Sequence, residues 1–280
     1  MRTVQLWLIA LAVILFAPFA QAQYHDVYFV GVDGFSTIAS GTYRGLPNPN
    51  FGRLTLLFAH YTPGTEHYHP IGAWSYSGPP ASPAVNNTNA NNRLPELYQR
   101  TTGQEYIYLY PGSGAFAGYY RSGIVRDPAR EEYSFLLTQP TGVLADSTDP
   151  AVQRLYNSSA GRWRGSLGEA RVGLRLVDIT PGLRITLEDG TPILPSVGSV
   201  YEIGRGDRFA FTPVFSVAFG SPIQPYTAAF QLIDLNNTPG YRPLRDSGIF
   251  YFDFYPVPEP STMAVLGAGL LGLWLHRRRR

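Results

Sequence analysis

Cysteine and lysine are both absent from the 280 residues of this chain. The lack of cysteine excludes disulfides, thiolate metal ligands, iron–sulfur clusters and cysteine nucleophiles. The lack of lysine leaves arginine as the only permanently basic side chain, and we have no functional account of this. A chain without disulfides must be held together by its core, and a content of 44% hydrophobic and 14% aromatic residues makes that feasible.

A surplus of positive charge is also lacking once the two ends are set apart. The formal net charge is +2, but five of the 22 basic residues lie at the ends, at Arg2 and at residues 277–280. The remaining 17 basic residues stand against 20 acidic ones, so the region between the ends is mildly acidic. We therefore expect no nucleic-acid partner, because no basic surplus exists to neutralise phosphates.

The N-terminus has the layout of a secretory signal peptide. Arg2 precedes an apolar run over residues 6–20, and Ala20-Gln21-Ala22 has small residues at the positions that signal peptidase requires. We therefore expect residues 1–22 to be a signal peptide that signal peptidase removes after Ala22. The alternative is an uncleaved membrane anchor, which these small residues disfavour.

The C-terminus carries three features in a fixed order. Pro258-Glu259-Pro260 is followed by an apolar stretch over residues 263–275 and by four arginines at 277–280. The apolar stretch is short for a membrane-spanning helix, which needs about 20 residues. Its three glycines weaken it further as a helix. The arginines would lie on the cytoplasmic side of a membrane.

This order of motif, short apolar helix and arginine cluster resembles the PEP-CTERM sorting signal. The resemblance covers residues 257–280 and implies that an exosortase-type sorting protease cuts near the Pro-Glu-Pro motif. It also implies a transient stay in the inner membrane through the C-terminal helix. The protein would then reach the cell surface or the exopolysaccharide matrix of a Gram-negative-type bacterium. An ordinary tail anchor with a chance Pro-Glu-Pro is the alternative.

The region over residues 23–256 is expected to form one β-rich domain. Short apolar or alternating segments recur between turns, and 29 glycines and 24 prolines favour many turns over long helices. The pattern predicts an all-β fold, an antiparallel β-sandwich or a barrel-like single domain, with a two-sheet split near residue 165 as the alternative. A short helix is expected near residues 149–156 and a long surface loop over residues 77–92. We expect strands at residues 27–31, 53–58, 106–110, 133–137, 170–177, 184–188, 208–211, 229–233 and 249–254.

Three of the five histidines lie within ten positions, at His60, His67 and His69. If the segment around His67 and His69 is extended, both imidazoles project from one face, because side chains alternate along a strand. His60 would close the group across the Pro63-Gly64 turn. This spacing predicts a site for a divalent metal, with zinc first and copper or nickel as alternatives. The competing interpretation is three loop histidines without a ligand.

Two further residues are candidates for the metal site. Glu66 is a weaker one, since it would point away from its neighbour His67, whereas Glu96 could return to the site after the predicted loop. His25 would stand third after cleavage at Ala22, where a free amine and a histidine can chelate copper or nickel. The alternative is that His25 is a structural residue at the start of a strand. No H-E-x-x-H pattern is present, so we do not expect an enzyme, and a metal-dependent hydrolase is the least favoured reading.

A second pattern spans most of the region before about Phe215, in the segments 67–72, 75–78, 91–96, 111–114 and 157–163. These segments resemble a family of PEP-CTERM proteins repressed by the zinc-uptake regulator. The resemblance implies synthesis under zinc starvation, and a surface histidine site would then act in zinc capture or buffering.

Two functions compete on these grounds. The first is an exported surface or matrix protein that binds zinc through the histidine cluster and serves zinc homeostasis. The second is a structural or carbohydrate-binding protein of the exopolysaccharide matrix, in which aromatic residues matter and the histidines do not. Aromatic side chains that could stack on sugar rings are Trp74, Tyr76, Tyr119, Tyr120 and Trp163.

Overall fold

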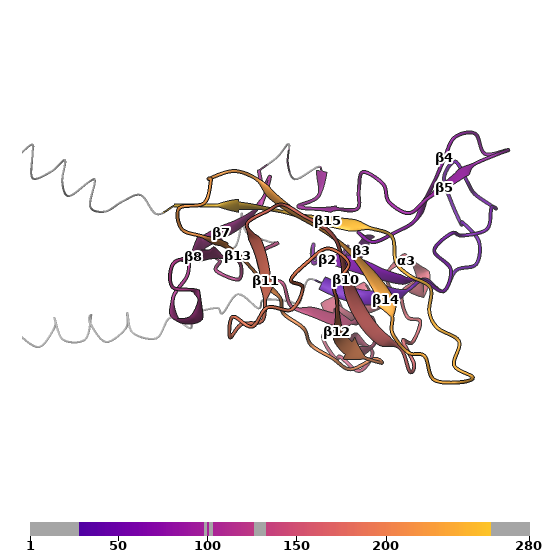
Figure 1. Cartoon of the computed structure of the whole chain (residues 1–280). Coiled ribbons are helices and arrows are strands. Elements are labelled where there is room, and N and C mark those ends of the chain that lie inside the picture. The colour runs from indigo at the N-terminus through magenta and orange to yellow at the C-terminus, as the bar shows by residue number, and fades with distance from the viewer. Residues whose placement is uncertain (1–27, 98–99, 101–102, 126–132, 259–280) are drawn as a thin grey trace, which may run out of the picture.

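The computed structural model of this chain describes residues 28–97, 100, 103–125 and 133–258 (Figure 1). The protein is mostly β, with 38% strand and 10% helix, which confirms the expected β-rich class. The predicted signal peptide at residues 1–22, His25 and the apolar stretch at 263–275 lie outside the described residues. Within the described residues, no helix is both long and apolar enough to cross a membrane.

A four-stranded sheet is built mainly from the N-terminal part of the chain. Its outer pair, β2 and β3, is an antiparallel hairpin, and its other edge, β9, runs parallel to β1. All seven residues of β2 are buried, so this strand is covered on both of its faces. In spatial order the strands are β3 (His67–Pro70), β2 (Leu54–His60), β1 (Tyr28–Val32) and β9 (Thr138–Pro140).

A curled nine-stranded sheet makes up most of the rest. Strand β15 lies inside it, between β14 and β7, and the short strand β6 (Arg93–Leu94) also pairs with it. Strands β4 (Ser75–Ser77) and β5 (Ala84–Asn86) form a separate hairpin. The order along the large sheet is β11 (Leu183–Thr186), β13 (Val214–Ala218), β8 (Tyr119–Arg121), β7 (Ile107–Pro111), β15 (Phe250–Pro256), β14 (Tyr226–Asp234), β10 (Arg171–Ile179) and β12 (Val200–Arg205).

The structure departs from the sequence-based expectation at several segments. Residues 133–137 and 208–211 are not strands, because pairing there is limited to an isolated bridge between Thr138 and Phe211. Strands β12 and β13 were not predicted, and the predicted loop at 77–92 contains β5. Pairing is also not purely antiparallel, since β15 runs parallel to both β7 and β6.

Helix α3 (Pro150–Gly161) confirms the helix expected near residues 149–156 and extends beyond it. Asp149 caps the N-terminus by accepting a hydrogen bond from the backbone N of Ala151 at 2.7 Å, and Pro150 occupies a first-turn position where its missing N–H costs nothing. The regular helix ends at Ser158, whose ψ of 162° is extended. The part of the chain that the structure describes also contains the short 3₁₀ helices η2 (Gly114–Phe116) and η3 (Thr141–Leu144).

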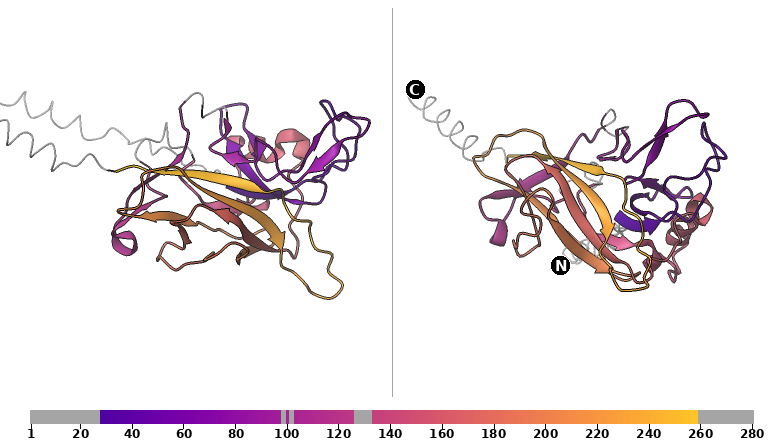
Figure 2. Two further views of the ribbon diagram at one scale, coloured as in Figure 1. Left: turned by 45° about the horizontal axis from the view of Figure 1, so that its top comes forward. Right: turned by 45° about the vertical axis from the view of Figure 1, so that its right-hand side comes forward.

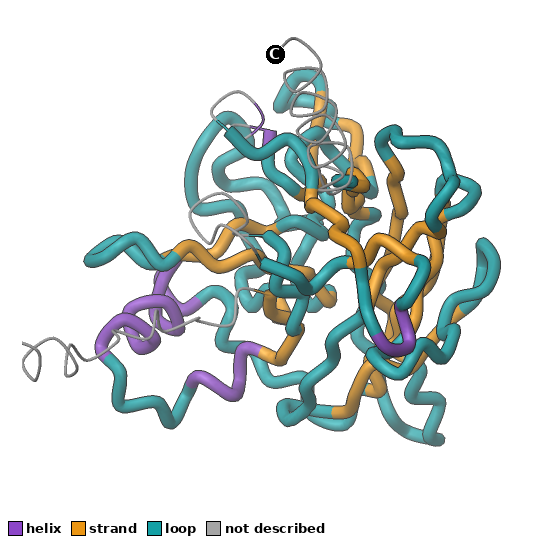
Figure 3. Tube along the Cα trace, turned by 90° about the vertical axis from the view of Figure 1, so that its left-hand side faces the viewer, coloured by secondary structure: helices purple, strands orange, loops and turns teal. Residues whose placement is uncertain are grey.

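Two groups of buried apolar side chains lie on opposite faces of the four-stranded sheet. Tyr28 and Phe58 face the large core shared with the curled sheet, which includes Phe230 and Phe254. Phe29 and Tyr68 face a smaller core that contains Leu155 of α3. Figure 2 shows the N-terminal strands and α3 on one side of β15 and the later strands on the other, and Figure 3 shows α3 at the flank of the strands. The four-stranded sheet is therefore a middle layer.

Candidate metal centre

The β2–β3 hairpin places three histidines on one face of the sheet. In the antiparallel register His60 pairs with His67, and Phe58 pairs with His69. Because side chains two apart on a strand share a face, His60, His67 and His69 all project from the face that carries Phe58. The ring centroids lie 4.3 Å apart for His60 and His69, and 4.8 Å apart for His67 and His69. The extended conformation expected for the His67–His69 segment is present as strand β3.

Glu66 belongs to the opposite face and does not join the histidines. Its carboxylate accepts two hydrogen bonds from Arg154 of α3, at 2.6 Å from Nε and 2.7 Å from Nη2. These bonds lower the pKa of Glu66 to about 2. Glu66 therefore ties the hairpin to α3, in line with its weak rank as a ligand candidate.

Glu96 returns to the cluster from a distant part of the chain. Its Oε2 lies 2.7 Å from His60 Nε2, and its Oε1 contacts His69 Nδ1. Burial raises the pKa of Glu96, but hydrogen bonds and charge from His60 and His69 outweigh burial and lower the pKa to about 2. The carboxylate is therefore ionised at neutral pH, buried, and in contact with two imidazoles.

A buried aspartate holds the segment that carries Glu96. Asp253 on β15 accepts hydrogen bonds from Arg93 Nη1 at 2.7 and 2.6 Å, and from Arg100 Nη2. Strand β6, which contains Arg93, also pairs directly with β15. The backbone around Glu96 is thus anchored on both sides, so that its carboxylate is positioned by the fold.

Tyr133 supports the same carboxylate from the core side. Its hydroxyl donates to Glu96 Oε2 at 3.1 Å, and its ring stacks on Phe58 with centroids 4.6 Å apart. The Tyr133 backbone carbonyl accepts a 2.9 Å hydrogen bond from the hydroxyl of Tyr28. Tyr133 could not be predicted from the sequence, because no local pattern marks a contact between residues 37 positions apart.

The contacts of the cluster need one proton more than its neutral imidazoles supply. His67 Nδ1 lies 2.7 Å from the carbonyl oxygen of Thr65, His67 Nε2 lies 2.9 Å from His69 Nε2, and His69 Nδ1 contacts the Glu96 carboxylate. Each of these three contacts needs a proton between its atoms, because carbonyl oxygens, carboxylate oxygens and unprotonated imidazole nitrogens can only accept a hydrogen bond. Two neutral imidazoles carry only two N–H groups. The third contact requires a doubly protonated imidazole or a metal ion.

The donor atoms are arranged closely enough for a metal ion. One atom from each of His60, His69 and Glu96 lies within 4.8 Å of the others. Tetrahedral Zn²⁺ with bonds of about 2.0–2.1 Å separates its ligand atoms by roughly 3.3 Å, so these atoms would have to move closer together to coordinate the ion. A cleft of about 490 Å³, lined in part by His69 and Glu96, lies against the cluster and supplies an entry path.

The structure thus brings together His60, His67, His69 and Glu96. Of the residues predicted for sorting, Pro258 is described and exposed, whereas Ala22, Glu259 and Pro260 lie outside the described residues. His25 is outside them as well, so its part in any site stays a prediction.

Comparison with known proteins gives one match. Residues 256–280 match the family model described as the PEP-CTERM protein-sorting motif. No curated protein and no solved structure matches the chain. The match supports an exported, surface-directed protein that an exosortase-type enzyme processes. It does not extend to the region that carries the histidine cluster.

Proposed function

We propose that this protein binds a divalent metal ion, zinc first, at the surface of the cell or in its matrix, through His60, His69 and Glu96. The observation that carries the proposal is the geometry of the cluster: an ionised, buried carboxylate contacts two imidazoles, and one ligand atom from each of the three residues lies within 4.8 Å of the others. Imidazole and carboxylate donors without thiolates suit zinc, and copper or nickel would also fit them.

His67 has a positioning role in this proposal. With its Nδ1 hydrogen bonded to the Thr65 carbonyl, a neutral His67 offers the lone pair of Nε2 to His69 Nε2. That selects the His69 tautomer that carries its proton on Nε2 and turns the Nδ1 lone pair toward Glu96 and the metal. Such hydrogen bonds behind a ligand fix its tautomer and orientation and increase its basicity.

The proposed role is capture or buffering of zinc, in zinc homeostasis. This role rests on the resemblance to the zinc-regulated family, which stays a prediction from the sequence, whereas the sorting motif supports the location at the surface. We assign the cluster to binding and not to catalysis. The expectation that the protein is not an enzyme stays a prediction.

Zinc titration of the purified full-length chain by calorimetry at neutral pH tests the proposal. We expect binding near one zinc per chain, and loss of that binding when His60, His67 and His69 are replaced together by alanine. Glu66→Gln, which removes a carboxylate that pairs with Arg154 on the opposite face of the hairpin, is the control and should bind as the parent does. Absence of heat in the parent, or binding that survives the triple replacement, would show that the cluster is not the site.

The biological role has its own test. In the source bacterium, a zinc chelator in the medium should increase the amount of this protein, and added zinc should decrease it. An amount of protein that does not respond to zinc would contradict the role in zinc homeostasis. Metal binding itself would still be tested by the titration.

A further inference from the structure

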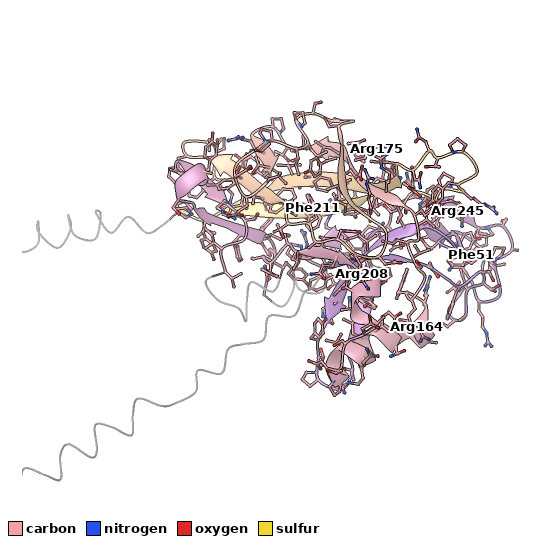
Figure 4. All side chains as sticks on the ribbon, turned by 90° about the horizontal axis from the view of Figure 1, so that it is seen from below. Phe51, Arg164, Arg175, Arg208, Phe211 and Arg245 are labelled. Atoms are coloured by element: carbon pink, nitrogen blue, oxygen red, sulfur yellow. The ribbon has the colours of Figure 1, made fainter. Side chains whose placement is uncertain are left out.

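A second cleft, distinct from the metal centre, lies at the end of the molecule that carries β4 and β5 (Figure 1). It measures about 560 Å³, within the range of small-molecule sites. Its walls come from the loop after β1, from the segment around β4 and from the C-terminal end of α3. Seen from below, Phe51 and Arg245 mark this end of the molecule, away from the grey terminal traces (Figure 4). We call this the aromatic cleft, after four of its lining residues: Phe35, Tyr43, Trp74 and Tyr76.

The aromatic rings of this cleft are held in fixed positions. The Tyr43 hydroxyl donates to the carbonyl oxygen of Gly78 at 2.8 Å, and the Tyr76 hydroxyl donates to that of Pro47 at 3.0 Å. The two rings lie 5.3 Å apart between centroids, at 49° to one another. Because the hydroxyls are engaged with the backbone, what these tyrosines offer a ligand is their ring surface.

The Trp74 backbone is fixed by an amide. Its N–H donates to Asn50 Oδ1 at 2.7 Å, and its carbonyl accepts from Asn50 Nδ2 at 2.8 Å. Both residues line the cleft. This reciprocal pair joins the wall around β4 to the wall after β1, so the cleft is built before a ligand arrives, and little ordering entropy opposes binding.

The cleft carries no uncompensated charge on its described lining. Arg162 is the one ionic side chain there, and its Nε donates at 2.8 Å to the carboxylate of the buried Asp33. Asp33 also accepts from Asn48 Nδ2 at 2.8 Å and from the Phe35 backbone N at 3.0 Å. An ionic ligand would therefore find no unpaired opposite charge, and the site favours a neutral one.

The wall formed by the end of α3 has a strained backbone. Ser159 and Ala160, which line the cleft, have φ values of 53° and 56°, in the left-handed region that costs free energy for residues other than glycine. Such conformations are retained where the surrounding structure requires them, and they concentrate at ligand sites.

We propose that the aromatic cleft binds a neutral pyranose oligosaccharide. The apolar faces of pyranose rings would stack on Tyr43 and Tyr76, and the sugar hydroxyls would exchange hydrogen bonds with the polar groups on the lining. A nucleotide or an acidic polysaccharide would bring charges that the cleft does not pair. The aromatic cleft is separate from the metal site. Of the aromatic residues proposed from the sequence to stack on sugars, Trp74 and Tyr76 line the cleft, whereas Trp163 is only 2% exposed and belongs to the core.

Calorimetric titration of the full-length chain with three hexasaccharides tests this inference. The probes are neutral cellohexaose and laminarihexaose, and acidic hexagalacturonate. We expect at least one neutral probe to bind and the acidic probe to bind more weakly. Tyr43→Ala and Tyr76→Ala should each weaken the neutral probe at least about tenfold, which corresponds to about 1.4 kcal/mol. Tyr76→Phe keeps the ring and should stay within a few fold of the parent.

Control variants separate loss of binding from loss of fold and from loss of the metal site. Tyr119→Ala removes a half-buried tyrosine on β8, at the other end of the molecule, and should bind sugar as the parent does. Glu96→Gln should also leave sugar binding intact. Thermal melting of each variant checks that it is folded. No binding of either neutral probe, a preference for the acidic probe, or unchanged affinity in a folded Tyr43→Ala variant would overturn the proposal.

Discussion

His60 and His67 are direct partners across the β2–β3 hairpin, and their imidazole rings stack with centroids 5.4 Å apart. The hairpin register alone therefore brings two of the three histidines together, and the two-residue period of β3 adds the third. Glu96 contacts two of these histidines, and its position depends on the whole fold.

Glu96→Gln should lower zinc affinity by about 100-fold, because the variant loses an anionic ligand and keeps only the imidazoles. Glu66→Gln is the matched control, since it removes a carboxylate one residue from His67 but on the opposite face of the hairpin. Calorimetry of both variants measures the difference. Equal losses in the two variants would mean that general negative charge, and not ligation by Glu96, drives binding.

Zinc binding should release about one proton, because the ion replaces the proton that the cluster needs in its absence. The binding heat at one pH should then differ between buffers of different ionisation enthalpy, and affinity should decrease toward acid pH, because protons compete with the ion for the ligand atoms. Titrations in phosphate-free buffers at several pH values measure both. Heats that do not depend on the buffer would contradict the proton count.

Tyr133→Phe should weaken zinc binding by roughly tenfold, the effect typical of losing a hydrogen bond behind a metal ligand. The variant keeps the ring that stacks on Phe58 and removes only the hydroxyl that donates to Glu96. Tyr241→Phe, which loses a hydroxyl bonded to Asp234 far from the cluster, serves as control. An unchanged affinity in Tyr133→Phe would show that this hydroxyl does not orient the carboxylate.

Asp253→Asn should destabilise the fold by about 2–3 kcal/mol and weaken zinc binding as well. The carboxylate is buried and pairs with Arg93 and Arg100, so its removal leaves two guanidinium groups without their counter-charge. We place the cost below that of fully buried pairs because both arginines are partly exposed. Denaturant unfolding gives the stability, and a folded variant with parent-like zinc affinity would separate Asp253 from the positioning of Glu96.

The Glu66–Arg154 pair should make stability depend on acid pH. The pKa of Glu66 is lowered to about 2 in the folded chain, below the ordinary value of 4.5 that applies when unfolded. A lowered folded pKa stabilises the fold above the unfolded value, and that stabilisation is lost as the pH falls from about 4.5 toward 2. Melting temperatures across this range, with a chelator present, should fall less steeply for Glu66→Gln than for the parent. Glu105→Gln, at an exposed carboxyl, should follow the parent.

The sequence could predict the local part of the metal centre. Alternation along an extended segment is enough to place His67 and His69 on one face, and the Pro63-Gly64 turn is enough to bring His60 back to them. It could not predict the contacts of Glu96 and Tyr133, because their positions depend on the pairing of β6 with β15 and on packing against Phe58.

In the fold, too, local features could be predicted from the sequence and long-range pairings could not. Strands with clear apolar alternation, such as β10 and β11, were predicted close to their observed bounds. The parallel pairing of β15 with β7 has no local signal, since more than a hundred residues separate the two strands. The segment at 133–137 has strand-like composition, but tertiary packing directs its pairing to Thr138 and beyond.

Strand β15 leads directly to the tail that carries the sorting motif, and this has a mechanical consequence. Its hydrogen bonds to β14 and β7 run along most of its length, and the backbone N of Val257 still donates to the Leu109 carbonyl at 2.8 Å. A force applied to the tail along the direction of the strand would act on these hydrogen bonds in shear. The bonds would then share the load and break together, whereas a perpendicular force would break them one after another. Anchored by its C-terminus, this domain should resist fluid drag well, and single-molecule pulling from that end would measure the rupture force.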